Sequence, residues 1–223
     1  MSMVKPDKNI IGSQQTRIRY NRIASIYNLL QAIPTSFIDN WRKKLLKKAK
    51  GKILEVGVGT GKNFDFYPAG ADVTAIDFAE KMIALAKKNA EKKGLTFKIE
   101  EGDVENLAYP DNFFDTVVAT FVFCSVPNPL QGLKELRRVV KPDGRALLLE
   151  HVRIDNLIMG WIMDRLNPLI VRITGANINR QTVENIKAVG FLIEEIEHLG
   201  FMKMVKMVIA KPNKDNPGAG GLA

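Results

Sequence analysis

Short apolar runs alternate with longer amphipathic segments through most of the chain. The runs, rich in Val, Ile, Leu and Phe, predict buried strands near residues 52–57, 71–76, 96–100, 113–120 and 144–152. Apolar residues at helical spacing predict intervening helices over 60–67, 79–93 and 128–140. Strands that alternate with helices favour an α/β fold, in which right-handed crossovers build a parallel sheet. Two later runs, joined at Gly200, predict a sixth and a seventh strand over Phe191–His198 and Met202–Ile209.

The beginning and the end of the chain carry different patterns. Residues 1–15 are polar and unpatterned, and a first helix is predicted over about 16–32. Pro34 separates it from a second helix, which Thr35 or Ser36 can cap. The last residues, rich in Asn, Gly and Pro, are expected to be disordered. The pattern predicts a basic helical lid over 1–50, one α/β domain over 51–212 and a disordered tail over 213–223.

The positive charge is concentrated at the start of the chain. Residues 1–52 hold 12 Lys or Arg against Asp7 and Asp39, a balance of +10, whereas the rest hold 21 basic and 22 acidic side chains, a balance of −1. The second helix places Phe37, Trp41 and Leu45 at helical spacing among these charges. Such a helix can lie on an anionic membrane, or it can pack its apolar side on the sheet. Nucleic acid is not expected, because no known binding module accompanies the charge.

The sequence predicts neither a membrane span nor an oxidising compartment. No apolar stretch approaches the roughly 20 residues needed to cross a bilayer, and the start of the chain lacks the layout of a signal peptide. The single cysteine, Cys124, falls in an apolar run, which predicts a buried side chain without a disulfide. The expected location is the cytoplasm, peripheral to the inner face of the membrane if the basic helix binds lipid.

The segment 52–64 combines a buried strand with a glycine-rich turn. Apolar residues bracket a single carboxylate, Glu55, and the glycines that follow are Gly57, Gly59 and Gly61. Glycine has no Cβ, so its backbone can pass close to a ligand. Twenty residues after Gly57 the second predicted strand ends in Asp77, which is placed to accept hydrogen bonds from ribose hydroxyls. The pattern predicts a nucleoside-bearing cofactor at the carboxyl ends of a parallel sheet.

The spacing of the glycines bears on the identity of that cofactor. A dinucleotide fingerprint is G-x-G-x-x-G, whereas this chain has G-x-G-x-G with Glu55 just before it. A carboxylate beside the turn would repel a pyrophosphate but suit a ligand with an ammonium group. S-adenosylmethionine (SAM) carries an ammonium, a sulfonium and no phosphate. The residues therefore favour SAM, and a nicotinamide-dependent oxidoreductase or a cofactor-binding regulator is the disfavoured alternative.

Three further motifs follow the glycine-rich turn in the expected order. They are Gly102-Asp103-Val104 after the third predicted strand, the run 113–123 and the segment Val140–Arg145 before the fifth strand. With them the chain resembles the class I SAM-dependent methyltransferases over roughly residues 50–212. The resemblance implies a Rossmann-like, doubly wound sheet of seven strands, mostly parallel with an antiparallel last strand, preceded by N-terminal helices. It also implies SAM as cofactor and S-adenosylhomocysteine as product.

The resemblance assigns roles at the methionine end of the cofactor. Glu55 would receive the methionine ammonium group, directly or through water. The backbone of the turn would contact the amino-acid part through Gly57, Gly59 and Gly61. Past the fourth predicted strand, Thr120 and Phe121 would line the channel for the methyl group.

It also assigns roles at the adenosine end. Asp77 would bind the ribose hydroxyls, and Phe78 would pack on the adenine. Asp103 would accept a hydrogen bond from the adenine amino group, and the Val104 N–H would donate one. For Asp77 and Asp103 the alternative is a carboxylate that only caps a helix or a turn.

The insertion over residues 153–180 bears on the methyl acceptor. Its apolar residues sit beside isolated polar ones, which suits a pocket for an apolar substrate with a polar head; the alternative is a lid helix buried on the sheet. Together with Tyr20–Tyr27, the chain is similar to the ubiquinone/menaquinone C-methyltransferases and to the phosphatidylethanolamine N-methyltransferases with their thiol-methylating relatives. Glu150–Val152 and the polar positions of 164–182 are closer to the second group. We therefore expect methylation of a lipid-like, phosphatidylethanolamine-type amine at a membrane surface; the alternatives are a quinone precursor and a small soluble metabolite or thiol.

A base is needed only if the acceptor arrives protonated, as an aminoethyl headgroup does at neutral pH. His151, at the carboxyl end of the fifth predicted strand, is the first candidate, and Tyr27 is the second. His198 lies in the sixth predicted strand and is expected to be structural. No cluster of ligand residues has metal-binding spacing, so no metal is expected. The sequence leaves the oligomeric state open.

Overall fold

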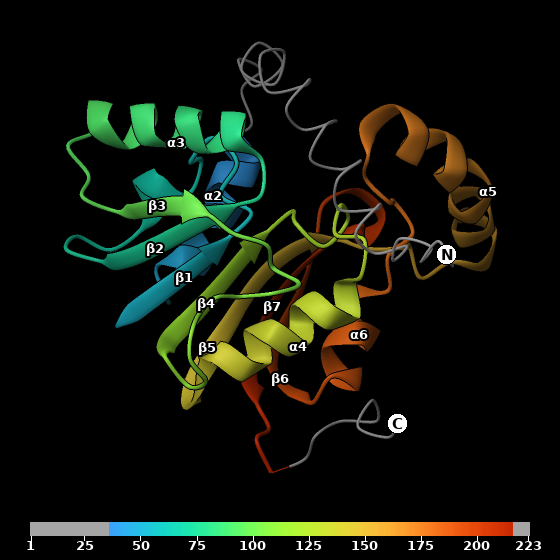
Figure 1. Ribbon diagram of the computed structural model, residues 1–223. Helices are drawn as coiled ribbons and strands as arrows, with labels where there is room; N and C mark the ends of the chain where they lie inside the picture. Colours follow the sequence, from blue (N-terminus) through green and yellow to red (C-terminus); the bar gives the residue numbers. More distant parts are fainter. Residues whose placement is uncertain (1–35, 216–223) are drawn as a thin grey trace, which may run out of the picture.

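The computed structural model describes residues 36–215, and in that range a seven-stranded sheet carries helices on both faces (Figure 1). The strands are β1 (Lys52–Val56), β2 (Asp72–Asp77), β3 (Lys98–Glu101), β4 (Phe114–Thr120), β5 (Val140–His151), β6 (Phe191–Leu199) and β7 (Val205–Pro212). The helices are α2 (Ser36–Leu46), α3 (Glu80–Lys92), α4 (Pro129–Val139), α5 (Leu157–Thr174) and α6 (Thr182–Ala188). Two short 3-10 turns are η1 (Phe64–Phe66) and η2 (Phe201–Lys203).

The strand order of the sheet is β3-β2-β1-β4-β5-β7-β6. Neighbours from β3 to β5 are parallel, and β7 is antiparallel to both β5 and β6. The predicted Rossmann-like sheet with an antiparallel last strand is thereby confirmed. The chain winds outward in one direction from β1 to β3 and in the other from β4, so the order reverses between β1 and β4. Open α/β sheets bind ligands outside the carboxyl ends of the strands at such a point.

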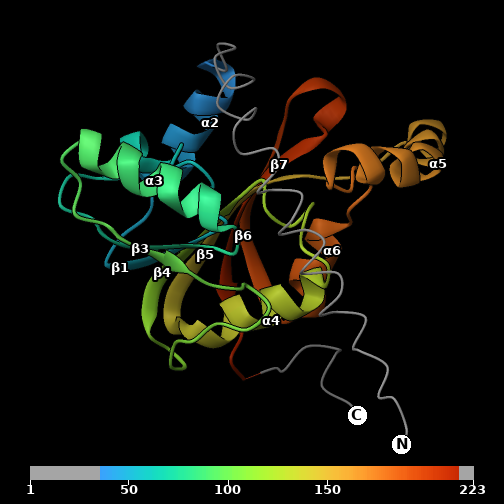
Figure 2. The same ribbon diagram turned by 45° about the horizontal axis from the view of Figure 1, so that its top comes forward.

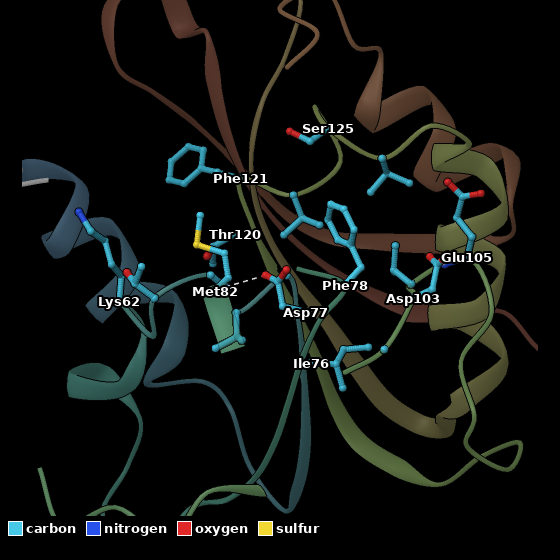
Figure 3. A pocket seen from close by; sticks show the side chains of 18 of the residues that line it. Lys62, Ile76, Asp77, Phe78, Met82, Asp103, Glu105, Thr120, Phe121 and Ser125 are labelled. Atoms are coloured by element: carbon cyan, nitrogen blue, oxygen red, sulfur yellow. Dashed lines mark hydrogen bonds between the residues drawn. The ribbon is translucent and has the colours of Figure 1, made fainter. Parts of the chain in front are cut away.

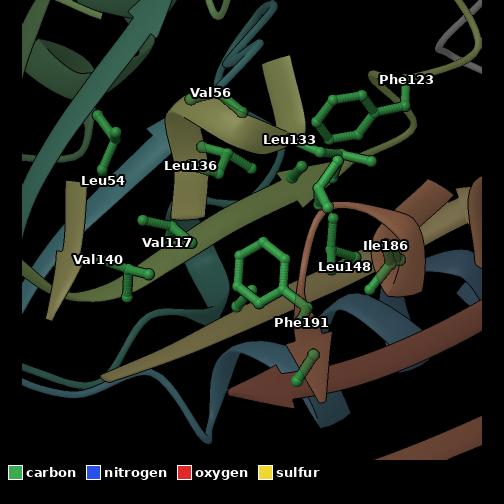
Figure 4. Packing of buried hydrophobic residues seen from close by; sticks show 14 of the residues in the cluster. Leu54, Val56, Val117, Phe123, Leu133, Leu136, Val140, Leu148, Ile186 and Phe191 are labelled. Atoms are coloured by element: carbon green, nitrogen blue, oxygen red, sulfur yellow. The ribbon is translucent and has the colours of Figure 1, made fainter. Parts of the chain in front are cut away.

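Side chains along each strand alternate between two cores, because successive residues of a strand point to opposite faces. Leu54 and Val56 of β1 join the core under α4 and α6, which Figure 4 shows around Leu136 and Ile186. Ile53 belongs to the other core, under α2 and α3. Both faces of the sheet are therefore covered, as the nearly continuous apolar runs of its central strands require.

Helix α2 is part of the second core. Leu45 and Leu46 are fully buried in the same cluster as the side chains of β1 and α3, so the core extends N-terminally beyond residue 50. The basic helix therefore packs these two leucines on the sheet, which is the second of the two alternatives considered for it. Contact between the charged side of α2 and a membrane stays a prediction.

Three element predictions need correction. The helix expected over 60–67 is a series of turns ending in η1, because Gly59 and Gly61 adopt positive φ and break the helical path. Strand β5 begins at Val140 instead of 144, since Val140 pairs with Phe114 ahead of a register shift. Strand β7 begins at Val205 instead of 202, because the preceding residues form η2 with positive φ at Met202.

Several predictions lie outside the described residues. These are the polar start and the helix over 16–32, which includes Tyr27, and most of the expected disordered tail. The first tail residue that follows β7 is described, and the Asn213 N–H donates to the Gly190 carbonyl oxygen at 2.8 Å. Between residues 36 and 215, no helix combines the length and apolar composition that crossing a bilayer requires.

Candidate active site

A cavity of about 400 Å³ opens at the carboxyl edge of the sheet, within the range of small-molecule sites. Its walls come from residues at or just past the ends of four parallel strands: Gly57 after β1, Asp77 at the end of β2, Thr120 at the end of β4 and His151 at the end of β5. This is the edge, next to the reversal of strand order, where the sheet topology favours a ligand.

The glycine-rich turn forms one wall and needs its glycines for steric reasons. Gly57 has φ +64°, and a Cβ built on it would lie 2.6 Å from a methyl group of Val122. The Gly59 N–H donates to Asp77 Oδ2 at 2.9 Å, and the Ala79 N–H donates to Oδ1 at 2.9 Å. Asp77 therefore joins the turn to β2 while it lines the cavity (Figure 3). Asp77 therefore does both things that were considered for it: it caps the turn, and it lines the cavity.

Charged side chains of opposite sign line opposite parts of the cavity. In Figure 3, Lys62 lies on one side, Asp103 and Glu105 lie on the other, and Asp77 and Phe78 lie between them. Asp103 Oδ1 accepts a hydrogen bond from the Glu105 N–H at 2.9 Å, which fixes its carboxylate in a local turn. A ligand with an electropositive donor group at one end and an anionic group at the other matches this distribution of charge.

Glu55 lies behind the cavity wall, not on it. Its carboxylate accepts hydrogen bonds from Asn63 Nδ2 at 2.9 Å and from the Tyr67 hydroxyl at 2.8 Å. Burial raises the pKa of Glu55 to about 7. Gly61 does not line the cavity either; because it has no Cβ it leaves room for the Phe64 ring, which a Cβ would overlap. Contact of Glu55 with an ammonium group stays a prediction.

The loop that follows β4 forms the opposite wall. Phe121 adopts φ +58°, and its ring lies 4.7 Å from the His151 ring. The next two backbone N–H groups, of Val122 and Phe123, donate to the buried carboxyl group of Glu150 at 3.0 and 3.2 Å. Burial raises the pKa of Glu150 to about 8 and lowers that of His151. Glu150 thus fixes the shape of the wall, a role that the sequence did not reveal.

The polar motif of the 153–180 insertion holds the same loop from the other side. Asn177 donates to the Cys124 carbonyl oxygen through its backbone N–H at 2.7 Å and through Nδ2 at 3.0 Å. Arg180 Nη2 donates to the Val126 carbonyl oxygen at 2.7 Å. Asn167 Nδ2, from α5, donates to Asn177 Oδ1 at 3.1 Å. Cys124 is buried, as predicted, and the motif therefore connects α5 with a wall of the cavity.

Helix α5 neither lines the cavity nor packs as a buried lid. The Asn156 side chain caps its first turn, and Gly175 in the left-handed conformation ends it. Of its residues, only Gly160 and Met163 are buried, whereas Leu157 is 91% exposed. The helix buried on the sheet is therefore wrong for the apolar side of α5, whereas a pocket for an apolar substrate stays a prediction. The spacing of apolar residues predicts a helix, but it does not show whether another element packs against its apolar side.

Most of the predicted cofactor residues converge on the cavity. Eight of the ten line it: Gly57, Gly59, Asp77, Phe78, Asp103, Val104, Thr120 and Phe121. Glu55 and Gly61 lie outside its lining, His151 lines it, and Tyr27 falls outside the described residues. The sequence prediction missed Arg42, which also lines the cavity. A signal was present, because Ile38, Arg42 and Leu45 follow one another at helical spacing on one side of α2.

Comparisons with known proteins identify the family of the chain. A family model described as a methyltransferase domain matches residues 54–148. The chain is 32% identical to a demethylmenaquinone methyltransferase of Lactobacillus johnsonii, over 96% of this chain and 93% of that one. It is 33% identical to the human thiol S-methyltransferase TMT1A, over 80% of this chain and 75% of the relative. It is also 38% identical to a phosphatidylethanolamine N-methyltransferase of Cereibacter sphaeroides, but that match spans only 47% of this chain and 53% of the relative.

Solved structures share the fold at low sequence identity. A SAM-dependent methyltransferase of Thermotoga maritima superposes with a TM-score of 0.67 at 18% identity, over 88% of this chain and 99% of that one. The cyclase SpnF superposes with a TM-score of 0.74 at 18% identity, over 90% and 96%. The second likeness shows that the fold alone does not fix the reaction. With the family match and the relatives, however, the assignment is clear: the chain belongs to the class I SAM-dependent methyltransferases.

The cavity fits SAM in size and in the chemistry of its walls. Asp77 and Asp103 offer carboxylates for the ribose hydroxyls and the adenine amino group, and Phe78 offers a ring between them. When bound, SAM supplies a methyl group already activated by the adjacent sulfonium. The residues of the chain therefore need to hold the acceptor in line and to exclude water, which is a positioning role. Thr120 and Phe121 are placed for it, at the end of β4.

Proposed function

We propose that this enzyme methylates a lipid-like amine of the phosphatidylethanolamine type at the surface of an anionic membrane. The observation that carries the proposal is a set of exposed apolar side chains on α5 and η2, two elements that follow or precede strands at the carboxyl edge of the sheet. We call this set the apolar rim, and its residues are Leu157, Ile158, Trp161, Leu166, Leu169, Ile173, Phe201 and Met202. Trp161, Ile173 and Phe201 are 59%, 72% and 79% exposed, which is unusual for side chains of this size.

The rim and the cavity lie at the same edge of the sheet. Helix α5 follows the carboxyl end of β5, and η2 directly precedes Val205, which pairs with His151. His151 also lines the cavity. Figures 1 and 2 show α5 projecting from this edge, away from the sheet. A lipid whose chains lie against the rim would therefore present its headgroup near the cavity.

The charges around the rim favour a lipid over a second protein chain. Arg165, whose guanidinium lies 5.4 Å from the Trp161 ring, and Arg172 accompany the apolar side chains on α5, while Asp164 is paired with Arg153 at 2.9 Å. Exposed apolar side chains with a tryptophan and accompanying arginines suit the headgroup region of an anionic membrane.

The basic helix α2 contributes less to this surface than its sequence suggests. Lys44 pairs with Glu197 at 2.6 Å and Lys48 pairs with Glu195 at 2.7 Å, both on β6. Arg42 lines the cavity instead of facing outward. We therefore assign the membrane contact to the apolar rim and leave α2 a supporting, electrostatic part.

His151 is the proposed base for an amine acceptor. Burial lowers the pKa of its imidazole, so at neutral pH the ring is unprotonated and able to take a proton from an ammonium group. Its contact with Phe121 places it beside the predicted methyl channel. An aminoethyl headgroup must lose a proton before its nitrogen can attack, which gives this position a chemical purpose.

A quinone precursor is the second candidate acceptor. It is favoured by one observation, the alignment with the Lactobacillus johnsonii demethylmenaquinone methyltransferase over nearly the whole of both chains. A thiol is the third candidate acceptor, because the chain is also similar to the thiol S-methyltransferase TMT1A, although over a smaller share of both chains. A quinone precursor is as apolar as a phospholipid, so the apolar rim would serve either.

The test is transfer of a labelled methyl group from SAM to three acceptors offered in parallel. These are phosphatidylethanolamine in vesicles with phosphatidylglycerol, a demethylated quinone in phosphatidylcholine vesicles, and a small soluble thiol. We expect label in the phospholipid. Label only in the quinone or only in the thiol would replace the proposed acceptor with that one.

The role of the apolar rim is tested by Trp161→Ser combined with Ile173→Ser. We expect this variant to lose most of its sedimentation with anionic vesicles and most of its lipid methylation. Leu192→Ser is the matched control, because Leu192 is 57% exposed but pairs with Lys211 at the opposite edge of the sheet. Equal sedimentation of all three proteins would contradict the proposed surface.

A further inference from the structure

Arg42 is the one arginine among the residues that line the cavity in the described part of the chain. Its Nη1 donates to Asn63 Oδ1 at 2.6 Å and to Thr120 Oγ1 at 3.0 Å, and its guanidinium lies 5.4 Å from the centre of the Phe121 ring. The side chain therefore lies between the glycine-rich turn and the loop after β4. It is held there by Asn63 on one side and by the consecutive residues Thr120 and Phe121 on the other.

We propose that Arg42 binds the carboxylate of the methionine moiety of SAM, which makes α2 a part of the cofactor site. The proposal rests on the SAM dependence of the family and does not depend on the lipid acceptor proposed above. It gives the basic helix a task other than membrane contact.

The rigid placement of α2 supports this role. Leu45 and Leu46 anchor the helix in the core, and the pairs Lys44–Glu197 and Lys48–Glu195 tie it to β6. A side chain that recognises a ligand is effective when its supporting element is already in place, because less ordering free energy is lost on binding. Arg42 thus projects from a helix that is already in place before a ligand binds, unlike a residue on a mobile lid.

The distribution of charge indicates which end of SAM faces Arg42. Asp103 and Glu105 lie on one side of the cavity, which suits the adenosine end, and Lys62 lies on the opposite side (Figure 3). Arg42 bonds to Asn63 and Thr120, away from the acidic side. The carboxylate is the sole anionic group of SAM, and the planar fork of an arginine matches a carboxylate better than a lysine does.

The hydrogen-bond network behind Arg42 strengthens the inference. Asn63 accepts from Arg42 through Oδ1 and donates to Glu55 Oε1 through Nδ2 at 2.9 Å. Asn63 therefore joins the Arg42 guanidinium to the carboxyl group of Glu55. Of these three residues only Arg42 lines the cavity, so Arg42 is the one placed to meet the carboxylate of a ligand.

The alternative is that Arg42 is only a structural strut between α2 and the walls of the cavity. The two roles differ in their response to decarboxylated SAM, which keeps the adenosine, the sulfonium and the ammonium group but lacks the carboxylate. A strut would affect binding of both ligands, whereas a carboxylate partner affects only SAM. Titration calorimetry of the full chain with each ligand, without acceptor, separates them.

We expect Arg42→Gln to weaken SAM binding by about 10- to 100-fold, the range for a hydrogen bond to a charged group. Its affinity for decarboxylated SAM should stay within about twofold of the wild-type value, since the removed group has no partner there. Lys43→Gln is the matched control, because Lys43 is the exposed neighbour of Arg42 on α2 and does not line the cavity. Thermal unfolding checks that each variant is folded. If Arg42→Gln does not fold, Arg42→Lys takes its place in the test.

Three outcomes would overturn the proposal. Equal weakening of both ligands would assign Arg42 a structural role, and unchanged binding of both would remove it from the cofactor site. Failure of the folded wild type to bind either ligand would overturn the cofactor assignment for this cavity, and the proposal with it. Loss of lipid methylation alone, with SAM binding intact, would instead contradict the proposed acceptor and leave the role of Arg42 standing.

Discussion

Two buried glutamates at the carboxyl edge, Glu55 and Glu150, organise the walls of the cavity without lining it. Glu55 is bonded to Asn63 and Tyr67, and Glu150 accepts from the two backbone N–H groups that follow Phe121. In each case the carboxyl group is buried and hydrogen-bonded but has no direct ion pair among the described residues. Burial therefore dominates, and the pKa of each rises, to about 7 and about 8.

The raised pKa of Glu150 predicts a pH dependence of stability. Its pKa in the folded chain lies above the ordinary value of 4.5, so the folded protein keeps a proton that the unfolded chain has released between these values. The free energy of unfolding should therefore fall as the pH rises from about 5 to 8, by at most about 1.4 kcal/mol per pH unit for this group. Glu55 acts in the same direction up to about pH 7.

Urea unfolding at pH 6 and pH 8 checks this expectation on the wild type and on Glu150→Gln. The variant should lose less stability over the interval, because its side chain does not titrate. Glu195→Gln, on the exposed side of β6, is the control and should follow the wild type. An identical pH dependence in all three proteins would show that Glu150 is not protonated in the folded state.

At the residue scale the sequence predicts most of the residues that line the cavity, but not the residues that support its walls. Asp77 and Asp103 were predictable because they end or follow strands and stand next to a glycine-rich turn. Glu150 belongs to a motif that the sequence shows. Its role is to accept hydrogen bonds from the loop after β4, nearly 30 residues earlier in the chain, and this depends on the path of that loop. Helical spacing places Arg42 on the same side of α2 as Ile38 and Leu45, but it does not show that the guanidinium reaches a cavity at the carboxyl ends of the strands.

At the scale of elements, α2 and α5 exchange the roles that their sequences suggest. The highly charged α2 is anchored in the core, whereas the apolar α5 keeps most of its large side chains exposed. Composition alone predicts the opposite. The difference arises because burial depends on whether a second surface is available, and α5 projects beyond the edge of the sheet (Figure 1).

The anchoring of α2 makes a direct prediction about stability. Leu45 is fully buried, so Leu45→Ala removes apolar contacts and leaves a cavity in the core. We expect a loss of about 2–5 kcal/mol in the free energy of unfolding. Lys47→Ala, at an exposed position just past the end of the same helix, should change it by no more than about 0.5 kcal/mol. Urea unfolding measures both, and similar small effects would mean that α2 is a loosely attached lid.

Secondary structure was predictable where periodicity was regular. The central strands lie within a few residues of their predicted positions, because buried parallel strands are nearly continuous apolar runs. The expected helix over 60–67 failed for a local reason, the positive φ of Gly59 and Gly61. The two glycines that predict a cofactor-binding turn are therefore also the reason why no helix forms over 60–67.

At the scale of the whole molecule, the order of the strands brings distant residues together at one edge. Gly57, Asp77, Thr120 and His151 are separated by up to 94 positions in the chain, yet all line one cavity because parallel strands end at the same side. That convergence could be predicted from the alternation of strands and helices. The apolar rim could not, because it depends on where α5 and η2 lie relative to the sheet.

The measurement that tests the central claim most directly is a calorimetric titration of the full chain with S-adenosylhomocysteine. The wild type should bind it with an affinity in the micromolar range. Asp77→Ala should bind at least tenfold more weakly, since roughly 1.5–3 kcal/mol is expected from each hydrogen bond to a charged group. Asp72→Ala, at the exposed opposite end of β2, should bind like the wild type. No binding by the folded wild type, with or without anionic vesicles, would contradict the assignment of this cavity to SAM.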